Sequence, residues 1–419
     1  MRSQAVAVVY ALTRLRTALR NAWVFLVLPL RSRPFAYVCA TDGGRELPSH
    51  AMCDVIPGRA PEPADAELLY ERYRASRSRP RRVGAYYAVK PLIPRGVQLA
   101  ARRTAARRQM HASFPAWPIE PALLRRRANA VKAELETRCA ERLPVVDLWP
   151  HGSPFAFVLT HDVEGRAGVE RIQDLLDIER RFGFVSSWNF CAEWYPLDPA
   201  ELDAVRRAGC EVGLHGIRHD GRLFASRATY RSNLPAIREY MQAWGADGFR
   251  SPSLGRNAEW MHELPCCYDS SFPDTDPFQP QPGGCCSIHP FFFGDVVELP
   301  ITLDQDFTLF ELLRQRSIDL WIRKIGWITR HRGLVNVLVH PDYMTSERLL
   351  LYERLLAYLA GQEGAWHALP RDVAKWWRTR DALRCVVGTG GDVRVEGVGA
   401  RAAEVAWARI QGEEISYER

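Results

Sequence analysis

From residue 154 onward, short apolar runs alternate with amphipathic helical segments, which is the pattern of successive βα units. The first run, residues 155–160 (FAFVLT), has no charged side chain and is typical of a buried strand. The segment after it carries Val169, Ile172 and Leu176 on one helical face and stops before Gly183. Seven or eight such units fit into about 225 residues, which predicts an α/β fold with a closed or nearly closed βα barrel.

The remaining units follow the same alternation. Strands are expected at residues 184–190, 210–214, 247–250, 266–269, 296–301, 334–339 and 366–369, with helices between them, notably 199–208, 308–330 and 345–360. After Arg380 the sequence becomes glycine-punctuated and strand-like at 383–387, 392–396 and 404–410. We therefore divide the chain into an N-terminal, mainly helical extension (1–151), a (β/α) barrel (152–380) and a small β appendage (381–419).

The N-terminal extension is rich in arginine, with six arginines at 72–82 and a basic helix expected at 96–109. It contains no chemical motif, and its arginines are interpreted as a solvated face. The whole chain of 419 residues has 56 basic and 49 acidic side chains, a net charge of +7. This excess is too small to bind a nucleic-acid backbone by charge, so we expect no nucleic-acid partner.

Two apolar runs near the N-terminus, residues 5–12 and 22–30, are separated by arginines. Neither run reaches the ~20 residues of a spanning helix, and neither resembles a signal peptide. We expect a cytoplasmic protein, with peripheral contact of residues 5–30 at the inner membrane face as an open alternative. The 10 cysteines lack a repeated spacing, which indicates reduced thiols, although a four-thiolate zinc site from the adjacent pairs at 266–267 and 285–286 stays open.

Polar side chains gather where the expected strands end. Since the carboxyl ends of barrel strands open on one face, these side chains should meet at one rim. They are Asp162 and Glu164 after the first strand, His215 and His219 after the third, Arg250 after the fourth, Asp269 after the fifth and His340 after the seventh.

Two of these histidines have metal-ligand spacing. His215 and His219 are four residues apart and would lie on one side of a helical turn, where they could share an ion. A carboxylate from Asp162 or Glu164 would complete a site with open positions for water and substrate, which is the arrangement of a hydrolytic zinc site.

The other groups suit acid–base chemistry. The second carboxylate could act as general base, and His340 could donate a proton to the leaving group from the opposite side. Arg250 would keep the base ionised, because a fixed cation lowers the pKa of a neighbouring carboxylate.

These residues resemble the motifs of the polysaccharide deacetylase family, which is carbohydrate esterase family 4 with its nodulation-B homology domain. The resemblance covers about residues 154–377 and comprises Thr160-His161-Asp162-Val163-Glu164, His215 to His219, Arg250 with Pro252, and Leu338 with His340. It implies a distorted (β/α)7 barrel and metal-dependent removal of N-acetyl, or sometimes O-acetyl, groups from sugars.

The chain departs from that family's usual motifs at several positions. Val163 replaces the second of two neighbouring aspartates, so by resemblance we assign Asp162 as base and Glu164 as metal ligand, with the reverse assignment open. Gly216 replaces a hydroxyl residue that could brace the histidines, and Ser253 stands where an aromatic residue is common. Asp269 is our candidate to orient His340, its alternative being a residue of a turn.

The sequence thus predicts a metal-dependent hydrolase, with Zn²⁺ as the favoured ion, that removes N-acetyl groups from a sugar in surface-glycan metabolism. Its partner would be an N-acetylated sugar or glycan. One alternative is a non-sugar amidase that opens a cyclic imide or ureide on the same fold, and another is a catalytically silent glycan-binding scaffold.

Overall fold

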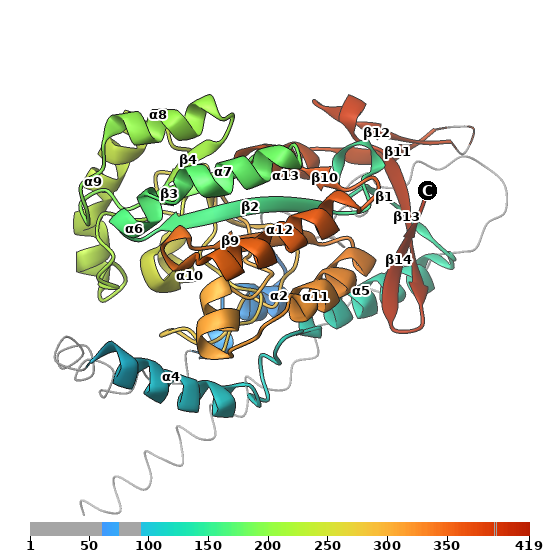
Figure 1. Cartoon of the computed structure of the whole chain (residues 1–419). Coiled ribbons are helices and arrows are strands. Elements are labelled where there is room, and N and C mark those ends of the chain that lie inside the picture. The colour runs from blue at the N-terminus through green and yellow to red at the C-terminus, as the bar shows by residue number, and fades with distance from the viewer. Residues whose placement is uncertain (1–60, 75–93, 389, 391) are drawn as a thin grey trace, which may run out of the picture. The chain divides into compact units, whose positions relative to one another are not determined.

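The computed structural model of the chain describes residues 61–74, 94–388, 390 and 392–419 (Figure 1). The apolar runs at 5–12 and 22–30, and the arginines at 75–82, lie outside the described residues. No helix in the described part is both long and apolar enough to cross a bilayer.

A curled, nine-stranded sheet holds the centre of the fold. Its parallel strands follow one another in the order β9, β2, β3, β4, β5, β6 and β8, with β7 antiparallel at the edge and β10 beside the first residues of β2. The bounds are β2 Ala156–Val163, β3 Ser187–Phe190, β4 Glu211–Leu214, β5 Gly248–Phe249, β6 Tyr268–Asp269, β7 Phe291–Phe293, β8 Val296–Glu298, β9 Leu334–Val339 and β10 Trp366–His367.

The curl of the sheet brings its two ends close together. Among the described residues no ladder joins β8 to β9, but the segment after β8 contacts β9 directly. The Leu303 amide donates to the carbonyl of Asn336 at 3.3 Å, and the Thr302 hydroxyl donates to the carbonyl of Leu334 at 2.7 Å. The predicted distorted (β/α)7 barrel is thereby confirmed, as an incompletely closed one.

Helices cover the outside of this sheet (Figure 1), so the central strands β2 and β9 are buried along their whole length. This explains why their sequences read as continuous apolar runs rather than as an alternation. The helices are α2 Pro63–Leu69, α4 Arg95–Gln109, α5 Ala122–Arg138, α6 Arg166–Val169, α7 Ile172–Arg181, α8 Pro199–Arg207, α9 Arg227–Trp244, α10 Ala258–Met261, α11 Asp319–Arg330, α12 Ser346–Ala360 and α13 Pro370–Asp381.

The helix ends show the local signals that the sequence offers. Asp198 caps α8 by accepting the Ala200 amide, and Glu201 completes a capping box with the Asp198 amide. Gly209 follows α8 with a φ of 80°, the left-handed conformation that ends helices at glycine.

One predicted helix is wrong. The expected single helix over 308–330 is two elements, a π-helix η5 (Phe307–Leu312) and α11. Arg314 between them has a φ of 58°, which a continuous right-handed helix cannot contain. The break lets η5 follow the end of the barrel while α11 packs on the sheet.

The N-terminal and C-terminal segments meet in a separate small sheet. Strand β1 (Leu143–Val146) pairs antiparallel with β13 (Val405–Gln411), which pairs in turn with β14 (Glu414–Glu418). A second small sheet joins β11 (Arg384–Val387) to β12 (Val393–Glu396). The strands expected after Arg380 are confirmed, whereas β1, β7 and β14 are strands that the sequence pattern did not reveal.

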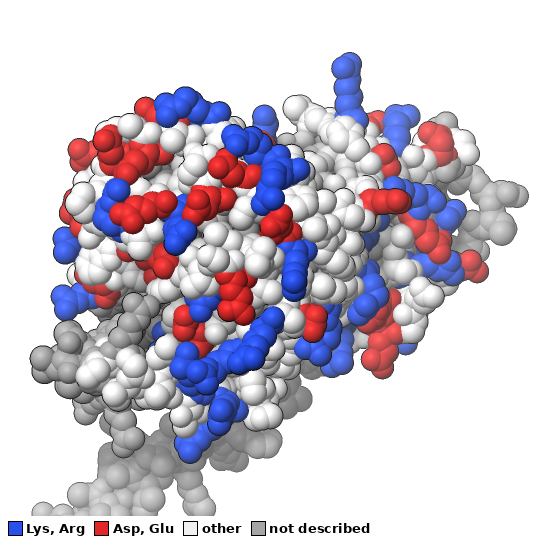
Figure 2. Space-filling model, viewed as in Figure 1, with Lys and Arg blue, Asp and Glu red and all other residues white. Residues whose placement is uncertain are grey.

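Acidic and basic side chains are interspersed on the face shown in Figure 2, which accords with the modest net charge.

Candidate metal centre and active site

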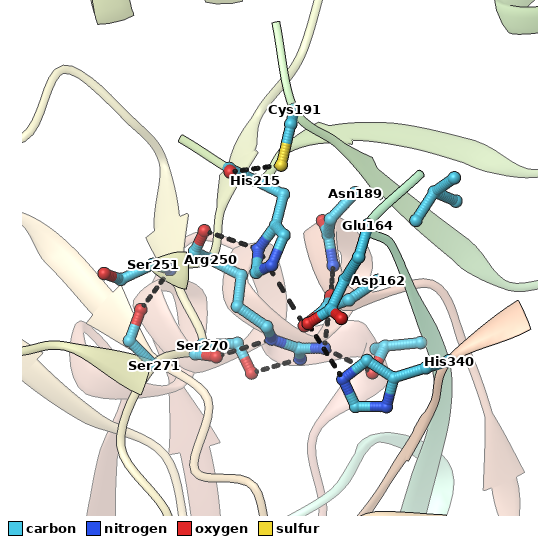
Figure 3. A network of polar contacts seen from close by, with 12 residues as sticks. Asp162, Glu164, Asn189, Cys191, His215, Arg250, Ser251, Ser270, Ser271 and His340 are labelled. Atoms are coloured by element: carbon cyan, nitrogen blue, oxygen red, sulfur yellow. Dashed lines mark hydrogen bonds and ion pairs between the residues drawn. The ribbon is translucent and has the colours of Figure 1, made fainter. Parts of the chain in front are cut away.

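Five of the candidate residues, Asp162, Glu164, His215, Arg250 and His340, meet at the carboxyl end of the parallel strands (Figure 3). Asp162 is the last residue but one of β2, and Glu164 follows that strand directly. His215 follows β4, Arg250 follows β5 and His340 follows β9. These side chains therefore lie in one cluster, as we expected from their positions at the strand ends.

Glu164, His215 and His219 form a group that could hold a metal ion. One ligand atom from each of them lies within 4.8 Å of the others, and no other such group occurs in the described part of the chain. Nε2 of His219 lies 2.9 Å from Oε1 of Glu164. Two imidazoles and one carboxylate are ligands that suit Zn²⁺ and similar divalent ions.

The hydrogen bonding of His215 fixes which ring nitrogen is available. Its Nδ1 lies 3.0 Å from the carbonyl oxygen of Arg250, which can only accept, so Nδ1 carries the proton. Nε2 then has a free lone pair, and this buried atom has no hydrogen-bond partner in the part of the chain that the structure describes. A buried nitrogen acceptor beside a carboxylate group has the chemistry of a metal ligand, so these residues fit a divalent cation.

The backbone of this motif differs from the sequence expectation. Residues 215–219 form no helical turn, although the two imidazole rings still face each other with centroids 5.2 Å apart. Gly216 has a φ of 67°, and a Cβ atom there would come within 2.8 Å of the Pro252 ring. The close approach to Pro252 explains why glycine stands where the family motif has a hydroxyl residue.

Glu164 is oriented by two residues that the sequence analysis did not single out. Tyr343 donates its hydroxyl to Oε2 of Glu164 at 2.8 Å, which leaves Oε1 directed at the histidines. Asp342 accepts the backbone N–H of Glu164 at 2.8 Å and that of Gly168 at 3.1 Å. The only sequence signal for them is their position directly after His340 at a strand end.

Asp162 lies beside the metal-ligand group and is not part of it. Its Oδ1 accepts the side-chain amide of Asn189 at 2.9 Å and NH1 of Arg250 at 3.2 Å. Burial raises the pKa of Asp162, but the charge of Arg250, helped by the hydrogen bond from Asn189, holds this pKa below its usual value. Asp162 is therefore an ionised carboxylate with one oxygen fixed by two donors.

Arg250 is itself held by three further hydrogen bonds. Its Nε donates to the carbonyl of Ser270 at 2.7 Å, NH2 to the hydroxyl of Ser270 and NH1 to the hydroxyl of Thr160, both at 2.8 Å. A guanidinium with this many fixed partners cannot follow a moving carboxylate, so it sets the position of Asp162.

His340 pairs with Asp306, a contact that sequence reasoning missed. Nδ1 of His340 lies 2.6 Å from Oδ1 of Asp306, and the His340 amide donates to Oδ2 at 3.1 Å. Burial lowers the pKa of His340, but the charge and the hydrogen bond of the Asp306 carboxylate act against burial, and the pKa of His340 is raised to about 10. Nε2 of His340 lies 3.9 Å from Oε1 of Glu164, on the metal-ligand side.

The expectation that Asp269 orients His340 is wrong. In the parallel register of β6 and β8, Asp269 stands opposite Glu298, and it accepts the hydroxyl and amide of Ser271 at 2.8 and 3.0 Å. Its side chain is thus used in the turn after β6 and beside Glu298. Burial raises the pKa of both of these carboxyl groups.

The adjacent cysteine pairs do not form a metal site. All four of these thiols are free, and burial raises the pKa of each. Among the described residues these four thiols do not come together as a group that could hold a metal ion, and the alternative of a four-thiolate zinc site is therefore wrong.

No family model matches the chain, and no curated protein matches it. Among solved structures, a protein from Mycobacterium smegmatis assigned as a polysaccharide deacetylase aligns with 56% of this chain and 93% of its own, at 21% identity and a TM-score of 0.44. An allantoinase covers 55% of this chain and 92% of its own at 17% identity, with a TM-score of 0.42. A family 4 carbohydrate esterase from Streptomyces lividans, solved with acetate, covers 52% and 93% at 16% identity, with a TM-score of 0.34. Such similarity is one of fold and assigns no activity.

Proposed function

We propose that this chain is a divalent-metal-dependent hydrolase that removes an acetyl group from the nitrogen of an N-acetylated sugar. The observation that carries the proposal is the cluster of Glu164, His215 and His219 between two charged pairs, Asp162 with Arg250 and His340 with Asp306. A metal-ligand group between an ionised carboxylate and a paired imidazole is the constellation that amide hydrolysis needs.

The metal ligands are proposed to be Glu164, His215 and His219. A divalent ion bound there would polarise the acetyl carbonyl and lower the pKa of a water molecule to about 7. Two features support this assignment over one in which Asp162 is the ligand. Only Glu164 lies within 4.8 Å of both histidine ligand atoms, and Oδ1 of Asp162 is already occupied by Asn189 and Arg250.

Asp162 is proposed to be the general base. Its ionised side chain would accept the proton of the attacking water, while Arg250 and Asn189 keep the carboxylate from rotating away. Fixing the acceptor in advance lowers the cost of reaching the transition state.

His340 is proposed to be the general acid. Asp306 accepts from Nδ1, so the other ring nitrogen, Nε2, faces the metal-ligand side and can donate a proton to the leaving amine. An amine is a poor leaving group unless it is protonated, so this step is needed for an amide more than for an ester.

The choice of an N-acetylated sugar rests on the motif resemblance together with this site. The same residues would also serve hydrolysis of a cyclic ureide, which is the second candidate. A scaffold without activity is the third, and the fixed orientation of Asp162 and His340 argues against it, because binding a glycan does not require an oriented base or acid.

The test is release of acetate from a panel of nucleotide-linked, lipid-linked and polymeric N-acetyl sugars, with a cyclic ureide as the alternative substrate. The protein is assayed as isolated, after removal of metal by a chelator, and after return of Zn²⁺. We expect metal-dependent acetate release from at least one sugar. Ureide opening without acetate release would favour the second candidate, and metal-loaded protein inactive on every substrate would favour the scaffold.

A further inference from the structure

A cavity lies away from the proposed active site. It is a space of about 210 Å³ between α5, α11 and the hairpin that ends in β14, which lie side by side in Figure 1. His331 lines it three residues before β9 begins, whereas His340 follows the end of β9. Six residues of strand span about 20 Å, so the cavity is at the opposite end of the barrel from the metal-ligand group.

The floor of this cavity contains a buried cation with spare hydrogen-bond donors. Arg127 of α5 lines the cavity and is only 5% exposed. Among the described residues its NH2 has no hydrogen-bond partner, and its Nε has only an ion pair with Asp65 at 3.6 Å. Burying a guanidinium with unsatisfied donors is costly, which is a reason to expect an anion to bind there.

The other groups facing Arg127 do not neutralise it. Nε2 of His289 points at the carbonyl oxygen of His331 at 3.1 Å and therefore carries the proton. Nδ1 of His289 is then an acceptor, 3.4 Å from NH1 of Arg127. His289 is thus a neutral imidazole that occupies one of the arginine's donors and leaves NH2 free.

The remaining lining is part apolar and part polar. Leu124, Leu148, Ile415 and the indole of Trp327 contribute apolar surface. The polar lining residues are His331, Tyr417 and the exposed Arg125, Glu413 and Glu414. An engineered apolar cavity of about 150 Å³ is known to bind benzene, so this cavity has room for a ring-sized body with an acidic group.

We propose that this cavity is a second binding site, for a small ligand that joins an anionic head group to a planar or aliphatic body. The head group would take up the free NH2 donors of Arg127, and the body would pack between Trp327 and the leucines. The charge-assisted hydrogen bonds would supply orientation, and burial of the body would supply affinity. The site is independent of the proposed deacetylation.

Titration calorimetry with phenyl phosphate tests this proposal, with phenol and inorganic phosphate as probes of each half of the ligand. We expect phenyl phosphate to bind at millimolar concentration or below, and more tightly than either half. Arg127→Met should weaken binding by about tenfold to a hundredfold, because it removes the charged donor and keeps the volume of the side chain. Leu124→Trp should abolish binding by filling the cavity while it retains Arg127.

Two controls separate this site from others. Arg126→Met makes the same chemical change on the neighbouring residue of α5, which does not line the cavity, and should leave binding unchanged. His215→Ala alters the metal-ligand group and should also leave it unchanged. Near-ultraviolet circular dichroism checks that each variant is folded. If Arg127→Met does not fold, the proposal is tested with Leu124→Trp instead.

Three results would overturn the proposal. They are failure of the unaltered protein to bind millimolar phenyl phosphate, equally tight binding of phenol, and loss of binding in His215→Ala, which would place the anion at the metal-ligand group.

Discussion

Asp306 accepts two hydrogen bonds from His340, one from Nδ1 of its ring at 2.6 Å and one from its backbone amide at 3.1 Å. The two oxygens of one carboxylate thus fix both the position of the residue and the direction of its ring. Nothing in the sequence near Asp306 marks it for this role, because it lies in the segment between β8 and η5, 34 positions before its partner.

Asp306→Asn tests this relationship. An amide can still hold the His340 backbone but cannot stabilise a positive ring, so we expect kcat for amide cleavage to fall by about tenfold to a hundredfold. Cleavage of an activated acetyl ester should fall less, because its leaving group needs no proton. Comparison of the two substrates is the measurement, and an equal loss on both would show that Asp306 supports the site without acting through proton donation.

The two carboxylates of the first motif are distinguished by a matched pair of variants. Asp162→Asn should retain metal while kcat falls by on the order of 10² to 10⁴, the usual worth of general acid–base catalysis. Glu164→Gln should lower metal affinity, and added metal should restore part of the rate. Metal content and rate are measured for both, and the opposite pattern would exchange the proposed roles.

Gly216 provides a test of the backbone geometry. Gly216→Ser introduces the hydroxyl residue of the family motif at a position with a φ of 67° and a Cβ contact of 2.8 Å to Pro252. We expect the free energy of unfolding to fall by about 1–3 kcal/mol more than in Gly221→Ser, because the new side chain overpacks against Pro252. Gly221→Ser is the matched control, because that glycine also has a φ of 67° but has nothing within 4 Å of its Cβ position. A stable Gly216→Ser protein would mean that the loop can rearrange around the side chain.

Glu211 predicts a pH dependence of stability away from the site. It accepts the hydroxyl of Tyr268 at 2.6 Å at the start of β4, and burial raises its pKa from 4.5 to about 7. Between about pH 4.5 and 7 the folded protein therefore keeps a proton on Glu211 that the unfolded chain releases. The contribution of the protonated Glu211 to the free energy of unfolding is thus fully present below about pH 4.5 and is lost as the pH rises through 7.

Glu211→Gln carries the neutral form at every pH. The stability of the unaltered protein relative to this variant should therefore decrease between pH 4.5 and 7, by on the order of 3 kcal/mol. Urea unfolding of both proteins at pH 5 and pH 8 measures the difference. A difference that does not change with pH would show that Glu211 is ionised in the folded protein.

The sequence was sufficient for the parallel strands of the barrel and for the residues at their ends, but it did not reveal the antiparallel strand β7. Continuous apolar runs such as β2 and β9 are long and buried on both sides, and the polar residue after each of them is fixed by the strand itself. Glu164, His215, Arg250 and His340 could be placed together on that basis alone.

Side-chain partners that lie far apart in the chain could not be predicted. Tyr343 reaches Glu164 across 179 positions because η6 (Pro341–Tyr343) turns back over the end of β2, and no local pattern encodes that turn. Asp269 was misplaced for the same reason, since its strand order sets it opposite Glu298. The domain boundaries at 151 and 380 stay predictions, although the pairing of β1 with β13 joins the two outer segments.

Metal content of the purified chain tests the central claim most directly. We expect one divalent ion per chain in the unaltered protein, and we expect it to be lost in His215→Ala and in His219→Ala. Two remaining protein ligands bind such an ion too weakly to retain it through purification. Elemental analysis by mass spectrometry gives the stoichiometry, with His289→Ala as the control that removes a buried histidine outside the group. Stoichiometric metal in either His215→Ala or His219→Ala would contradict the account.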